Sequence, residues 1–151
     1  MRNIVILILL LLKMNAYAEE LVPLNIYIKK NPAYLTNNLE AEYVANRCGS
    51  LMTILANRTL EADKTKVIVQ IADEYNRKGN VYSIAGLMLS KSPVSSEKKY
   101  IELHKALLIT YSNLTLKNWK SGNMFKGLIE QDLETCMVHK TFYEKLSKSL
   151  R

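Results

Sequence analysis

The chain of 151 residues has few of the residues that build small rigid folds or bind metals. It contains two cysteines, five glycines and three prolines. The scarcity of glycine and proline argues against a collagen-like chain and against a turn-rich all-β fold. Two cysteines cannot form a disulfide-dense scaffold or a four-cysteine zinc site. The two histidines, His104 and His139, form no His-x-x-x-His or Glu-x-x-His pair, so we expect no metal site.

Sequence patterns of common catalytic sites are also missing. There is no Gly-x-Ser-x-Gly, no glycine-rich phosphate loop and no Cys-x-x-Cys. A haem held between Met52 and His139 is disfavoured, because the expected helices would offset these ligands by ~10 Å along the bundle axis. Acidic residues that lie close together in the sequence are either adjacent or separated by one residue. They therefore point in different directions around a helix and indicate solvated faces. These are Glu40 and Glu42, Asp73 and Glu74, and Glu130, Asp132 and Glu134. We expect no catalytic residue and no cofactor.

What the chain does contain is apolar and basic. Hydrophobic residues make up 48% of the sequence, and 21 basic against 14 acidic residues give a net charge of +7. This composition excludes intrinsic disorder and predicts one domain with an ordinary core. The basic residues are spread along the chain without a run of five or six like charges. A nucleic-acid partner is therefore not expected.

The N-terminal segment is typical of a secretory signal peptide. Arg2 precedes nine apolar residues, 4–12, and small alanines flank Tyr17 in Ala16–Ala18. We predict cleavage after residue 18, which leaves Glu19 at the mature N-terminus and a charge of +5. A transmembrane anchor would need ~20 apolar residues, and Lys13 ends this run too early. The mature protein is expected in the periplasm or outside the cell, without a membrane anchor.

The rest of the chain predicts an all-α domain over residues 32–151, after a short lead-in over 19–31. Apolar residues recur every three or four positions in four segments, at 32–58, 60–90, 96–120 and 123–149. The first helix starts at the Asn31–Pro32 cap or, alternatively, at Asn37, and Thr59 is the expected cap of the second. Residues 77–80, around Gly79, allow a kink or a split in the second helix, and residues 67–69 also permit a short strand. Short connections predict an up-down-up-down four-helix bundle.

The two cysteines test this topology. Cys48 lies on the apolar stripe of the first helix and Cys136 on that of the last, at depths of ~16 and ~21 Å from the same pole. In an exported protein we therefore predict a Cys48–Cys136 disulfide, with two buried free thiols as the alternative. A redox-active pair is disfavoured, since Cys-x-x-Cys spacing is absent.

Polar residues near the predicted bridge suggest a further contact. Arg47 and Asp132 should lie close to the cysteines, either as an ion pair that sets the helix register or as a pair that anchors a ligand. His104 is expected as a hydrogen-bonded core histidine and His139 as a rim residue. The tyrosines are expected to line the core with their hydroxyls at its edge. In the predicted mature chain, without Tyr17, they are Tyr27, Tyr34, Tyr43, Tyr75, Tyr82, Tyr100, Tyr111 and Tyr143.

The sequence alone does not say what this protein does. It favours a non-enzymatic module that binds another envelope or extracellular protein, as an adaptor, an inhibitor or a stress-protective factor. The alternative is a carrier of a small ligand or lipid, with an apolar cavity between the helices. An enzyme of unrecognised type ranks third. The oligomeric state is open.

Overall fold

A computed structural model describes residues 21–91 and 95–149, and these residues form only helices and turns. The all-α prediction is confirmed. The predicted signal peptide lies outside the described residues and stays a prediction. The helices are α2 (Leu24–Lys30), α3 (Asn38–Ala62), α4 (Lys66–Ser90), α5 (Glu97–Lys120) and α6 (Leu128–Lys148).

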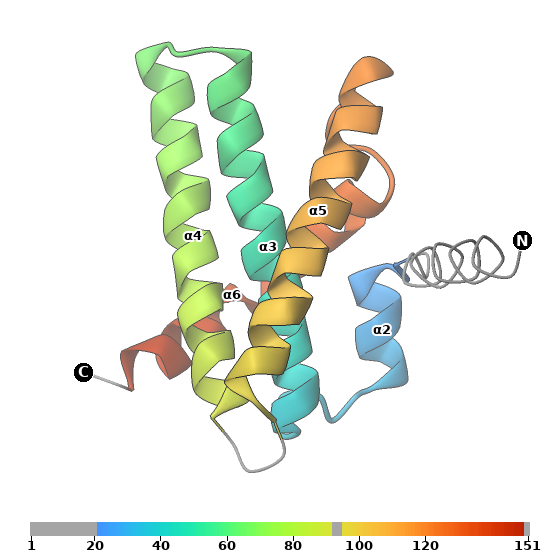
Figure 1. The fold of residues 1–151 in the computed structure, drawn as a ribbon, viewed down its shortest axis with the longest axis vertical. Coiled ribbons are helices and arrows are strands. Elements are labelled where there is room, and N and C mark those ends of the chain that lie inside the picture. Colours follow the sequence, from blue (N-terminus) through green and yellow to red (C-terminus); the bar gives the residue numbers. More distant parts are fainter. Residues whose placement is uncertain (1–20, 92–94, 150–151) are drawn as a thin grey trace, which may run out of the picture.

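The four long helices alternate in direction, as the sequence predicts. Helices α3 and α4 form an antiparallel hairpin, α5 packs mainly on α3, and α6 passes behind the hairpin, packing on both its helices (Figure 1). The short helix α2 occupies the predicted lead-in and packs against α6. Helix α3 therefore contacts each of the other long helices and forms the centre of the bundle.

The first long helix begins at the second of the two predicted caps. The side chain of Asn37 accepts hydrogen bonds from the backbone N–H groups of Leu39 and Glu40. The start at Asn31–Pro32 is wrong, because residues 32–36 form turns that lead from α2 into α3. Thr59 caps nothing, since α3 continues to Ala62 and buries Thr59 inside its last turns. Burial at this position outweighs the capping preference of the side chain.

Gly79 lies inside α4, which runs from Lys66 to Ser90 without a split and without a strand at residues 67–69. A Cβ atom at Gly79 would lie 3.2 Å from Cβ of Met52. On the facing helix, a Cβ atom at Gly49 would lie 2.8 Å from Oγ of Ser83. These glycines therefore let α3 and α4 approach closely, which explains why a helix-stopping pattern occurs within a helix.

The third helix matches its prediction and the fourth starts late. Ser96 caps α5 by accepting a hydrogen bond from the N–H of Lys99 at 3.2 Å. Helix α6 begins at Leu128 rather than at 123, because residues 121–127 form a wider connection. Gly122 and Gly127 adopt φ angles of +89° and +63° there, which glycine tolerates best.

The core lies around α3 and is filled by leucine, alanine and tyrosine side chains. Tyr82, Tyr111 and Tyr143 have no exposed surface. Several apolar residues that fit the helical spacing are at least one-third exposed instead. These residues are Leu35, Leu39, Val67, Ile71, Ile101, Phe125 and Met137. Leu35 and Phe125 lie in the connections before α3 and α6, and the others lie on helix faces that neighbouring helices leave uncovered.

Candidate functional site

A buried ion pair joins α3 to α6 through the two residues singled out near the cysteines. Nη2 of Arg47 donates to Oδ2 of Asp132, and neither side chain has exposed surface. Tyr111 of α5 joins them: its hydroxyl oxygen accepts from Nε of Arg47 at 3.1 Å, and its O–H donates to Oδ2 of Asp132. The three side chains therefore connect three helices, and the sequence analysis missed the part played by Tyr111.

The same pair holds the segment before α3. The backbone N–H of Leu24, the first residue of α2, donates to Oδ1 of Asp132 at 2.7 Å. Nη1 of Arg47 donates to the carbonyl oxygen of Val22 at 2.7 Å. The guanidinium carbon of Arg47 also lies 5.7 Å from the ring centre of Tyr43. Both ions are thus surrounded by partners, as a buried charge requires.

The electrostatics of this network keep Arg47 charged and Tyr111 neutral. Burial alone lowers the pKa of Arg47, but Tyr111 and Asp132 beside it raise that pKa above its ordinary value. Burial, reinforced by Asp132, raises the pKa of Tyr111 well above 10. A ligand cannot reach Arg47 or Asp132 in this arrangement because both are covered. The geometry therefore favours a pair that sets the helix register over one that anchors a ligand.

The predicted disulfide is present directly beside this network. Cys48 and Cys136 are bonded, with their Cα atoms 5.6 Å apart and a sequence separation of 88. The hydroxyl of Tyr82 donates to the carbonyl oxygen of Cys136, and the ring of Tyr82 lies 5.0 Å from that of Tyr143. Burial raises the pKa of both tyrosines. The bridge itself is buried, since Cys48 and Cys136 are 0% and 1% exposed.

Both histidines are hydrogen-bonded to other side chains. Nδ1 of His104 lies 2.7 Å from Oδ1 of Asn46 and 2.9 Å from Oγ of Ser50. Nδ1 of His139 lies 2.6 Å from the hydroxyl of Tyr34. Burial lowers the pKa of each imidazole, which favours its neutral form. The two rings therefore link helices and loops to one another.

Two acids predicted on solvated faces are buried, namely Asp132 of the ion pair and Glu42. Glu42 is 6% exposed and accepts a hydrogen bond from Oγ of Ser95. Burial raises the pKa of Glu42, and the Ser95 contact opposes that rise. The neighbouring Glu40 accepts from the hydroxyl of Tyr27. Among the residues that the structure describes, no cluster of three His, Cys, Asp or Glu side chains could hold a metal ion.

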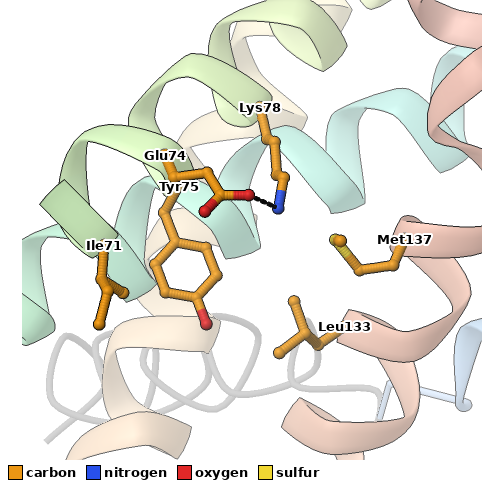
Figure 2. Close-up of a pocket in the computed structure, with 6 residues that line it drawn as sticks. All are labelled: Ile71, Glu74, Tyr75, Lys78, Leu133 and Met137. Carbon is orange, nitrogen blue, oxygen red and sulfur yellow. Dashed lines mark ion pairs between the residues drawn. The ribbon is translucent and has the colours of Figure 1, made fainter.

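An apolar groove lies between α4 and α6. It has a volume of about 210 Å³ and is lined by Ile71, Glu74, Tyr75, Lys78, Leu133 and Met137. Leu133 and Met137 point from α6 toward α4, and the Glu74–Lys78 ion pair lies at the groove (Figure 2). Ile71 and Met137 are 40% and 42% exposed. The groove therefore offers apolar contacts beside one fixed charge pair.

Comparison with known proteins found no matching family model, curated protein or solved structure. In the described parts of the chain, no helix is long and apolar enough to cross a membrane. The disulfide is consistent with an oxidising compartment.

Proposed function

We propose that this protein is an exported, non-enzymatic module that binds another protein of the cell envelope or the extracellular space. The observation that carries the proposal is the open apolar groove between α4 and α6. Its partner would insert apolar side chains between Ile71 and Met137 and place a polar group against the Glu74–Lys78 pair. An adaptor, an inhibitor or a stress-protective factor could each work in this way.

Export is supported by two independent features. The N-terminal pattern of Arg2, an apolar run and Ala16–Ala18 is typical of a cleaved signal peptide. A disulfide such as the one between α3 and α6 is typical of proteins in oxidising compartments, which include the periplasm and the extracellular space.

A binding role is favoured over catalysis because both histidines and the buried carboxylate Asp132 already have structural partners. His104 and His139 are hydrogen-bonded to other side chains, and Asp132 is neutralised by Arg47. A general base must reach a substrate proton within hydrogen-bond distance, and a covered carboxylate cannot.

The test is site-specific photo-crosslinking in the native host. A photoreactive residue at Met137 should trap one partner, whereas the same residue at Val138 should trap little of it. Val138 is the matched control, because it is 75% exposed on the same helix but lines a different hollow, beside Asn25 and Ile28 of α2.

The trapped protein is then purified and its affinity measured. Met137→Lys should weaken binding about tenfold or more, because the groove would have to desolvate a charge, while Val138→Lys should change it little. Equal effects of the two substitutions would contradict the proposal. Recovery of a stoichiometric lipid instead of a protein would favour the carrier alternative.

A further inference from the structure

The charged residues between Glu102 and Glu130 are all basic. Residues 103–129, which cover most of α5 and its connection to α6, contain four lysines and no acid. Lys117, Lys120 and Lys126 are exposed and gather near the C-terminal end of α5. Figure 1 shows this end of α5 leaning away from α3 and α4.

Large apolar side chains are exposed among these lysines. Leu116 and Trp119 are 41% and 39% exposed near the end of α5, and Phe125 is 36% exposed in the connection that follows. About two turns before Leu116 on α5, Ile109 is 64% exposed. We call Leu116, Lys117, Trp119, Lys120, Phe125 and Lys126 the α5 tip. Soluble proteins rarely gather exposed aromatic and aliphatic side chains without a binding role.

The aromatic residues of the α5 tip share a hollow. Trp119 and Phe125 line a surface depression of about 370 Å³ together with Met124 and with Ala62 at the end of α3. Two acids, Glu61 and Asp63, adjoin Ala62 in sequence. Glu61 is paired with Arg58 at 2.5 Å, Lys64 directly follows Asp63, and Lys66 lies two residues further on. The basic character of the α5 tip is therefore not cancelled by the neighbouring element.

We propose that the α5 tip docks this protein on an anionic lipid bilayer. Lysine side chains can extend their charged ends toward phospholipid headgroups while their apolar stems lie along the surface. Tryptophan and phenylalanine favour the boundary between headgroups and acyl chains. The mode is peripheral, in keeping with the lack of a membrane-crossing helix among the described residues.

The charge pattern favours a bilayer over a protein partner for this surface. Protein interfaces are commonly depleted in lysine, whereas basic side chains of a single sign around exposed aromatic residues suit a uniformly anionic surface. The α5 tip shares no residue with the α4–α6 groove. The inference therefore goes beyond the proposed protein binding, and either can fail alone.

Trp119 is the only tryptophan of the chain, so its fluorescence reports directly on this surface. The processed, oxidised protein is mixed with vesicles of phosphatidylcholine alone or with one-third phosphatidylglycerol. We expect binding to the anionic vesicles only, a shift of Trp119 emission to shorter wavelength, and quenching by lipids brominated near the headgroup. Raising the salt concentration should weaken binding, because the charge attraction is screened.

Matched variants distinguish membrane binding through the α5 tip from attraction caused by the net positive charge of the whole protein. Replacing Lys117, Lys120 and Lys126 with Gln should weaken binding about 100-fold, since each lysine near an anionic surface contributes roughly fivefold. The control replaces Lys30, Lys99 and Lys148, three exposed lysines elsewhere, and should weaken binding far less. Phe125→Ser should weaken binding about fivefold at any salt concentration, and Val138→Ser should not.

Four results would overturn the proposal. They are equal binding to neutral vesicles, an equal loss in the two triple variants, and vesicle binding with unchanged Trp119 emission. The fourth is a lipid-free dimer that shields Trp119, which would assign the α5 tip to self-association. Circular dichroism of each variant checks that the helical fold is retained.

Discussion

Arg47 and Asp132 form an ion pair without exposed surface, although 85 positions separate them in the chain. Their contact joins the central helix α3 to α6, and Tyr111 adds α5 to the same network. Buried pairs of this kind are costly to break, because the remaining ion loses both water and its partner.

Removing either ion is therefore expected to cost more than half of what removing both ions costs, so the two substitutions should not be additive. Asp132→Ala should lower the free energy of unfolding by about 3–5 kcal/mol, because it leaves Arg47 buried and unpaired. Arg47→Met combined with Asp132→Leu should cost less than the sum of the two single substitutions. Urea denaturation of the oxidised variants measures the coupling. Additive single effects would show that the two side chains do not act as a pair.

Opening the disulfide should lower stability without abolishing the helices. The bridge closes a loop of 88 residues, for which the chain-entropy model predicts ~4.5 kcal/mol before any strain is subtracted. We expect this loss in the Cys48→Ala, Cys136→Ala double variant, measured by urea denaturation against the oxidised parent. Reduction with dithiothreitol should destabilise the parent by a similar amount and leave the double variant unchanged. An effect of reductant on the double variant would point to another cause.

Gly86→Ala should destabilise the protein although alanine is the better helix former. A Cβ atom at Gly86 would lie 2.7 Å from Cε2 of Tyr100, and the hydroxyl of Tyr100 is tied to the carbonyl of Ser83 at 3.1 Å. The ring cannot move away without breaking that hydrogen bond. We expect a net loss of about 1–3 kcal/mol by thermal and urea denaturation. Gly79→Ala, whose nearest contact would be 3.2 Å, should cost less. The reverse order would contradict this packing.

Acidification from pH 7 to pH 5 should reduce stability through His139. Burial lowers the pKa of His139 below its ordinary value of 6.5, while the unfolded chain keeps that value. The unfolded state therefore binds more protons as the pH falls, and the free energy of unfolding decreases. Below the lowered pKa, this histidine has no further effect. Urea denaturation at several pH values measures the free energy of unfolding, and an NMR titration of the imidazole measures the pKa of His139.

The control for this pH dependence is His139→Gln, which keeps a hydrogen-bond acceptor for Tyr34 and removes the titrating group. Its stability should fall less between pH 7 and pH 5. The remaining decrease comes partly from His104, whose pKa burial also lowers. An unchanged slope, or an imidazole that titrates above 6.5, would contradict the prediction.

Local sequence signals located the helices but misplaced some of their ends. Asn37 was recognisable as a cap because its short side chain reaches backbone N–H groups within three residues. Thr59 resembled a cap equally well, yet it is buried within α3. Gly79 resembled a helix stop, but it serves the close approach of two helices. Both misassignments depended on a neighbouring helix, which no short window of sequence contains.

The sequence by itself determined the helical periodicity, the four-segment order and the pairing of Cys48 with Cys136, because helical rise and short connections restrict which residues can meet. Tertiary structure alone decided that Tyr111 and the backbone of Val22 and Leu24 complete the ion pair of Arg47 and Asp132. It also decided that Glu42 is covered and that the aromatic α5 tip stays exposed. The physical reason is that burial depends on how the helices rotate and cross. That arrangement is determined jointly by side chains from several segments of the chain.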